Sequence, residues 1–197
     1  MRTGLTRTLS KFLKERPHKL DDISLMGSII YTDHMDPLIR VLPSNKTIKH
    51  LNIAGCSLTH SSCRLLSTFM INCYTLSDMD VSHCRINYQG SRYLIEALSR
   101  NITMRKFNFS HNELKSSTFE FSIKIAAIIT RHPSLMHLDI TNTNLCREEI
   151  IFIGLSLPIS KTLLSCHLTA QKLPYYERIF LRAAIAARVG YQYRRGT

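Results

Sequence analysis

The chain has 197 residues, and its 26 Lys and Arg outnumber its 14 Asp and Glu, which gives a formal charge of +12. This length suits one ordinary domain, and no apolar run reaches the ~18 residues that a membrane-spanning helix needs. The sequence has only seven glycines and lacks the motifs of serine hydrolases, zinc peptidases, P-loop proteins and dinucleotide-binding folds. We therefore expect no enzyme, no cofactor, no bound metal and no small-molecule substrate.

Residues 1–19 are basic and place Leu5, Leu9, Phe12 and Leu13 at helical spacing. An apolar stripe on a basic helix is typical of a mitochondrial transit peptide. It is also what a helix needs in order to cover the open end of a stack of repeats. We predict an N-terminal cap helix and keep the mitochondrial interpretation as the alternative.

One pattern recurs six times within residues 20–173: apolar-x-x-apolar-x-apolar-x-x-(Asn, Cys, Ser, Thr or Gln)-x-apolar. The spacings between copies are 28, 28, 28, 31 and 28, and the copies begin at Leu20, Ile48, Leu76, Met104, Leu135 and Leu163. The alternation of apolar residues predicts a short strand in each copy. A fixed period of this size indicates stacked units that share one core.

The second half of each period predicts a helix. An apolar residue stands ten positions before the next copy, at Leu38, Leu66, Leu94, Ile125 and Ile153. Further positions three and four residues later, such as Val41 and Leu42 or Ser156 and Leu157, complete one helical face. The single spacing of 31 places three extra residues within 116–121, as a loop or an extra helical turn.

The stretch from Ile86 to Leu114, INYQGSRYLIEALSRNITMRKFNFSHNEL, resembles the leucine-rich repeat family, and specifically its ribonuclease-inhibitor-like subfamily. The matching positions are Gly90, Leu94, Ala97, Leu98, Asn101 and Asn112. The resemblance implies an α/β solenoid, a horseshoe of about six strand–turn–helix units with a parallel sheet on the concave face and helices on the convex face. In the slot of Asn112, which forms the asparagine ladder, other repeats carry Ser28, Cys56, Cys84, Thr143 and Gln171.

In this fold, the strand side chains between the core positions point to the concave face. They form two rows, which are Asp22, His50, Asp78, Lys106, His137 and Ser165, and Ser24, Asn52, Asp80, Asn108, Asp139 and His167. Metal ligands must converge, and this spacing across repeats is not a ligand pattern. The rows also lack an aromatic anchor, so we expect a mainly solvated face. Its candidate partner-binding residues are His50, Asp78, Asp80, Lys106, His137 and Asp139.

Within residues 174–197 we predict a C-terminal cap helix over 175–189. The tail after it is rich in Tyr and Arg, the residue types favoured at binding hot spots. The candidate partner-binding residues here are Arg178, Arg182, Arg188, Tyr191, Tyr193, Arg194 and Arg195. Residues 1–20 and 172–197 carry +5 each and leave +2 on the 151 residues between them. Basic ends suit an acidic partner such as tubulin tails, and also nucleic acid or anionic lipid.

The six cysteines are scattered without a CxxC pair, which favours reduced thiols in an intracellular protein. Ribonuclease-inhibitor-like repeats occur in GTPase regulators, innate sensors, actin-filament cappers and axonemal or cytoskeletal subunits. The resemblance therefore implies a non-catalytic protein–protein interaction scaffold in a ciliary, axonemal or other cytoskeletal assembly. The alternative is a subunit of a mitochondrial or ribonucleoprotein complex that contacts nucleic acid through its basic ends.

Overall fold

The computed structural model describes residues 3–16, 19–26, 30, 32–114, 118–168, 174–176 and 179. Helices and strands alternate along this part of the chain. The strands are β1 (Asp22–Ser24), β2 (His50–Asn52), β3 (Asp78–Asp80), β4 (Lys106–Asn108), β5 (His137–Asp139) and β6 (Ser165–His167). The helices are α1 (Thr3–Glu15), α2 (Thr32–Ile39), α3 (His60–Asn72), α4 (Tyr88–Arg100), α5 (Glu120–Arg131) and α6 (Arg147–Ser156), with 3-10 helices η1 (Leu42–Ser44) and η2 (Leu157–Ile159).

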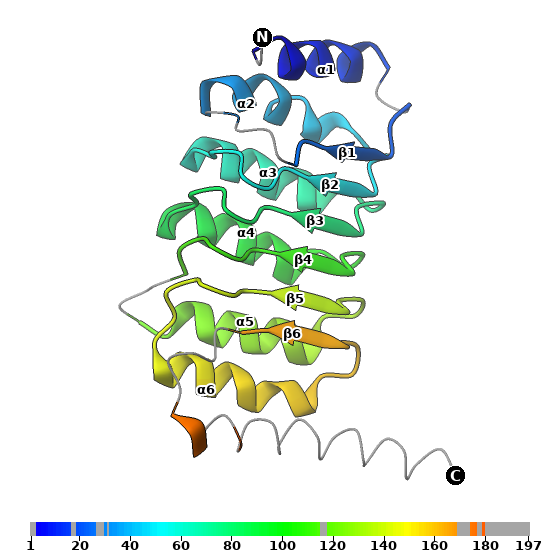
Figure 1. Ribbon diagram of the computed structural model, residues 1–197. Coiled ribbons are helices and arrows are strands. Elements are labelled where there is room, and N and C mark those ends of the chain that lie inside the picture. The colour runs from blue at the N-terminus through cyan, green and yellow to red at the C-terminus, as the bar shows by residue number, and fades with distance from the viewer. Residues whose placement is uncertain are drawn as a thin grey trace, which may run out of the picture.

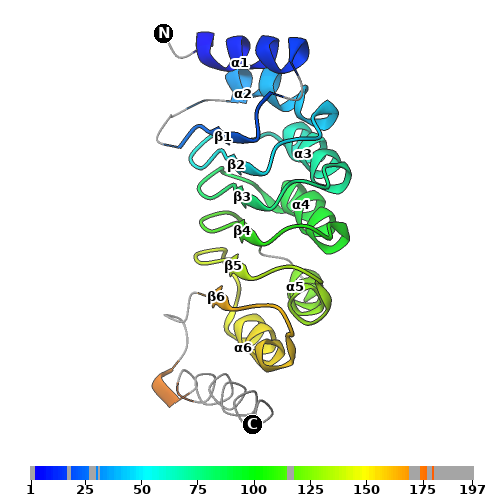
Figure 2. The same cartoon turned by 90° about the vertical axis from the view of Figure 1, so that its right-hand side faces the viewer.

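The strands form one parallel sheet in chain order, from β1 to β6. Figure 1 shows this ladder of short strands, with each helix carrying the chain back to the next strand. In the side view of Figure 2, the sheet lines the concave side and α3 to α6 lie on the opposite side. The predicted fold class, an α/β solenoid with a concave parallel sheet and convex helices, is confirmed.

Each strand has three residues, and in β1 to β5 the middle one is buried and points into the core. In β2 to β5 these middle residues are Leu51, Met79, Phe107 and Leu138, all buried. Their neighbours point to the other face of the sheet, as the two-residue period of a strand requires. The equal register across all six strands stacks the side chains of like positions into continuous rows.

In the third, fourth and fifth repeats, the ladder residue bonds the backbone of the turn after the strand. The side chain of Asn112 donates to the carbonyl oxygens of Val81, Phe109 and Ser110, and accepts from the backbone N–H groups of Cys84 and Ile86. Other repeats use a single donor there. The thiol of Cys84 bonds carbonyl oxygens, and the hydroxyl of Thr143 donates to Ile140. The slots of Ser28 and Gln171 lie outside the described residues.

Two of the predicted helical faces are shorter in the structure. The helix α2 ends at Ile39, so Val41 and Leu42 lie beyond it, and Leu157 lies beyond the end of α6. Pro43 and Pro158 follow at these points, and a proline has no backbone N–H to donate to the α-helical hydrogen-bond ladder. The chain continues there as the 3-10 helices η1 and η2, and all three apolar side chains stay buried.

The longer fourth repeat inserts its extra residues before its helix. From Asn112 to the start of α5 there are eight positions, whereas α4 starts four positions after Cys84. The helix α5 has 12 residues and α4 has 13. The insertion therefore adds no helical turn to α5, and its residues 115–117 lie outside the described part.

The helix α1 packs against α2 at the N-terminal end of the stack (Figure 1). Its buried face consists of Thr6, Ser10 and Leu13, with Leu9 partly buried. The predicted apolar stripe is wrong at Leu5, which is 51% exposed, because the helix is rotated to place its small hydroxyl residues against α2. Among the described residues, no helix is long and apolar enough to cross a membrane.

Candidate functional site

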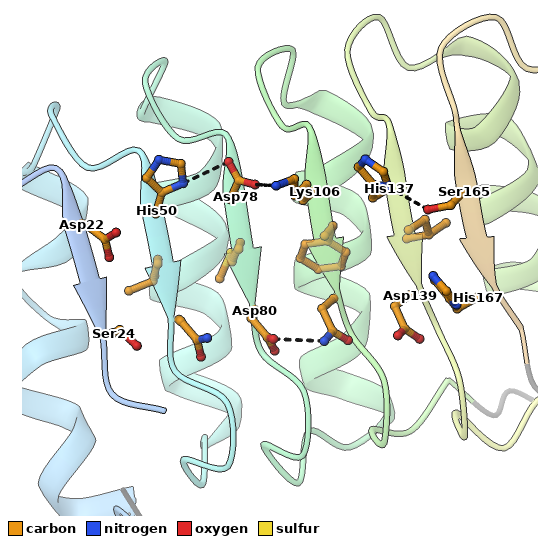
Figure 3. A pocket seen from close by; sticks show the side chains of 16 residues that line it. Asp22, Ser24, His50, Asp78, Asp80, Lys106, His137, Asp139, Ser165 and His167 are labelled. Atoms are coloured by element: carbon orange, nitrogen blue, oxygen red, sulfur yellow. Dashed lines mark hydrogen bonds and ion pairs between the residues drawn. The ribbon is translucent and has the colours of Figure 1, made fainter. Parts of the chain in front are cut away.

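A trough of about 520 Å³ runs along the concave face and takes side chains from all six strands. Its floor is formed by the buried residues Leu51, Met79, Phe107 and Leu138. Two rows of polar side chains stand above this floor (Figure 3). The first row comes from the first residue of each strand, and the second row comes from the third residue. These rows contain the six candidates that the sequence placed on this face.

Asp78 is the centre of the first row. One carboxylate oxygen lies 3.0 Å from Nδ1 of His50, and the other lies 3.3 Å from Nζ of Lys106. The neighbouring Ser77 hydroxyl also donates to this carboxylate. Burial by itself raises the pKa of Asp78, but the hydrogen bonds from Ser77 and Lys106, with the charges of Lys106 and His50, lower it below its ordinary value. Asp78 is therefore ionised at neutral pH and bridges three strands.

Side chains of the second row form hydrogen bonds within the turns at the ends of the strands. Asn52, Asp80, Asn108 and Asp139 each accept a hydrogen bond from the backbone N–H two residues later, at 2.8 to 3.1 Å. This local bond is a common use of Asn and Asp in turns. One oxygen of each side chain is thus committed to the fold, and only the remaining atoms face a ligand. This role of Asp80 and Asp139 does not follow from their spacing in the sequence.

The remaining contacts in the trough link neighbouring strands. The side-chain amide of Asn108 donates to the second oxygen of Asp80 at 3.0 Å, and His137 Nδ1 lies 2.7 Å from the Ser165 hydroxyl. Figure 3 shows these pairs crossing from strand to strand. The two rows hold four aspartates and one lysine, a formal charge of −3 with the histidines neutral. The concave face is therefore acidic, whereas the whole chain is basic.

The arrangement suits recognition by charge and hydrogen bonding. Within the described residues, no group of three or more His, Cys, Asp or Glu is placed to hold a metal ion. The cysteines are free, and burial raises the pKa of Cys56 to about 11 and that of Cys63 to about 12. Thiols in such surroundings are poor nucleophiles at neutral pH.

Two surface features were not anticipated from the sequence. A hollow of about 460 Å³ crosses α3, α4 and α5, and is lined by His60, Gln89, Arg92, Tyr93, Glu96 and Lys124. On the turns, the imidazole rings of His83 and His111 stack with their centroids 3.8 Å apart. Both of these histidines have positive φ. A search for polar residues recurring 28 positions apart would have found this pair.

The predicted partner-binding residues of the C-terminal end lie outside the described residues. They are Arg178, Arg182, Arg188, Tyr191, Tyr193, Arg194 and Arg195. The predicted cap helix over 175–189 is described only at residues 175, 176 and 179. The assignments at this end stay predictions.

No family model matches the chain, and no curated protein matches it. Among solved structures, the tropomodulin C-terminal domain of Caenorhabditis elegans aligns over 96% of this chain and 96% of that domain, with 13% identity and a TM-score of 0.58. Leiomodin-1 actin-binding site 2 aligns over 94% of this chain and 90% of that one, with 13% identity and a TM-score of 0.51. At this identity the similarity shows a common fold, and assignment to the ribonuclease-inhibitor-like subfamily stays a prediction.

Proposed function

We propose that this chain is a non-catalytic protein-binding subunit of a cytoskeletal assembly, and that it contacts its partner through the concave trough. The observation that carries this proposal is the fold shared with leiomodin-1 actin-binding site 2, along 94% of this chain. A site described as actin-binding is thus built on the same repeat architecture. Actin filaments are the first partner to test.

The trough supports a binding role on physical grounds. It spans all six strands, and its polar side chains are held in a fixed register by the sheet. Side chains on rigid elements are positioned more accurately than those on loops. The rows provide hydrogen-bond donors, acceptors and charge, while the apolar floor is packed into the core. Such a surface selects a partner by complementary polar groups.

Co-sedimentation tests the proposal. The purified chain is mixed with actin filaments, and separately with microtubules, and the pellet is quantified at low and physiological salt. A charge of +12 favours unspecific binding to acidic polymers, so a basic globular protein of similar size and charge is the control. We expect saturable pelleting with actin filaments that persists at physiological salt. Pelleting no better than the control with both polymers contradicts the cytoskeletal proposal.

The finer assignments from the sequence are tested separately. They are a ciliary or axonemal location, tubulin as partner, and the alternative of a mitochondrial or ribonucleoprotein complex that binds nucleic acid. Saturable pelleting with microtubules would support tubulin. A fluorescently tagged chain distinguishes an axonemal signal from a cytoplasmic filament or mitochondrial signal.

A further inference from the structure

The concave face of the sheet is open to a partner. No described element covers it, and α3 to α6 lie behind the sheet (Figure 2). The side chains of both rows are exposed or half-buried, while the residues between them in β1 to β5 are buried. A ligand in the trough therefore meets the polar rows first.

The charge of this face complements a basic ligand. The rows hold a formal charge of −3, although the chain carries +12. Part of the acidity is used internally, because Lys106 pairs with Asp78. Within the described residues, Asp22 has no ion pair, and the carboxylate oxygen of Asp139 that is not used in the turn has no donor. These two groups are available to cations from outside, whereas both oxygens of Asp80 already accept hydrogen bonds.

The acidic residues stand on alternate strands. They are Asp22 on β1, Asp78 and Asp80 on β3, and Asp139 on β5. The intervening strands β2, β4 and β6 present no carboxylate to the trough. Neighbouring strands lie about 4.8 Å apart, so acidic positions recur about every 9.6 Å along the trough. A ligand that follows the trough meets carboxylates at this interval within each row, from Asp22 to Asp78 in the first row and from Asp80 to Asp139 in the second.

We propose that the trough binds an extended segment of a protein partner in the polyproline II conformation, with Lys or Arg at every third residue. A polyproline II helix has three residues per turn and rises ~3.1 Å per residue, so the same side recurs about every 9.3 Å. In a β-strand, side chains on one face recur about every 6.7 Å. In an α-helix, seven residues cover about 10.5 Å. Of the three, the polyproline II repeat fits the alternate strands best.

Synthetic peptides test the proposal on the full chain. The probe is the tripeptide Pro-Pro-Lys repeated four times, with blocked ends and a fluorescent label. One comparison peptide replaces each Lys by Glu, and another has the same composition with its four lysines adjacent. We expect the spaced lysine peptide to bind best and to weaken as ionic strength rises. If the glutamate peptide binds equally well, the proposal that the ligand is basic is wrong. If the adjacent-lysine peptide binds equally well, the proposed spacing of one basic residue in three is wrong.

The trough offers variants that remove charge and keep the fold. In Asp22→Asn/Asp139→Asn, the new amide at 139 retains the oxygen that accepts the turn hydrogen bond, as Asn52 and Asn108 do in the native chain, and the side chain at 22 is exposed. We expect this double variant to bind the spaced peptide roughly tenfold more weakly, in line with two exposed ion pairs. The control Glu96→Gln removes the same kind of charge on the convex side. Unchanged affinity in the double variant overturns the proposal.

A second variant guards against a folding defect. Asp22→Asn alters an exposed side chain on the first strand, and it should weaken peptide binding by a few fold while its unfolding midpoint stays that of the native chain. This inference rests on the proposed function, but the two fail separately. Peptide binding without filament pelleting removes the cytoskeletal role and keeps the ligand chemistry. If the double variant pellets with filaments as well as the native chain does, the cytoskeletal role is kept and the basic ligand of the trough is removed.

Discussion

The side-chain amide of Asn112 donates a hydrogen bond to the carbonyl oxygen of Val81, in the preceding repeat, at 2.8 Å. The same side chain accepts from two backbone N–H groups of that repeat, those of Cys84 and Ile86. Asn112 is 5% exposed, so water is a poor substitute for these partners. One side chain thereby joins two turns of the solenoid.

Asn112→Ala should destabilise the chain by about 3 kcal/mol, because several buried backbone groups lose their partner at once. Asn112→Cys is the matched variant, since cysteine occupies this slot in the two preceding repeats, at Cys56 and Cys84. We expect the free energy of unfolding of Asn112→Cys to lie between those of the native chain and of Asn112→Ala. Urea denaturation measures the free energy of unfolding of the native chain and of both variants. An alanine variant as stable as the native chain contradicts the role of the ladder residue.

Gly90→Ala should destabilise the contact between α3 and α4. A Cβ at Gly90 would lie 2.9 Å from Sγ of Cys63 and 2.9 Å from Cγ2 of Ile86, and overpacking of this kind costs about 1–3 kcal/mol. Gly4→Ala is the control, because a Cβ there meets nothing within 4 Å and alanine favours a helix. Thermal unfolding should show a lower midpoint only for Gly90→Ala. Equal midpoints for the two variants would refute the close approach.

His132→Asn should reduce the loss of stability in mild acid. Nδ1 of buried His132 accepts from the backbone N–H groups of Ser134 and Leu135. Burial lowers the pKa of His132 below its usual 6.5, although the carbonyls of Asn101 and Leu98 oppose the shift. The unfolded chain therefore takes up this proton first, and stability falls as pH drops below about 6.5 toward the folded pKa.

Asparagine is suited to this site because Asn45 and Asn101 make the same pair of bonds at the corresponding positions. The measurement is the urea midpoint at pH 7.5 and at pH 5. The difference between the two should be smaller for His132→Asn than for the native chain. His60→Asn, on the exposed start of α3, controls for loss of one histidine. An identical pH dependence of the native chain and His132→Asn would contradict the prediction.

Asp78→Asn should remove an acid-sensitive contribution to stability. The folded pKa of Asp78 is lowered, so its carboxylate stabilises the fold above the unfolded pKa of ~3.9, and this contribution disappears as pH falls through the folded pKa. The loss at pH 7 should not exceed ~1 kcal/mol, as for other partly exposed pairs. Denaturation at pH 7 and pH 3 tests this. Asp21→Asn, which breaks the exposed pair with Lys49, provides the comparison.

Much of the trough was predictable from spacing. The six copies placed His50, Asp78 and Lys106 in one row, and the parallel register puts them side by side. The turn bonds of Asp80 and Asp139 were not predictable from that spacing, because they depend on the local backbone at the strand ends. The rotation of α1 was also missed. Leu5 matched an apolar stripe, but packing against α2 placed Thr6 and Ser10 inside instead.

The sequence by itself determined the repeat, because each copy has to present the same apolar positions to a shared core. It thereby determined the order of the strands, their register and the residues on the concave face. Only the tertiary structure decided how the charges combine. The ion pairs of Asp78 and the free positions at Asp22 and Asp139 depend on distances across strands that lie 28 or more residues apart. Such distances are set by the stacking of neighbouring repeats, so they cannot be read from the sequence of one repeat.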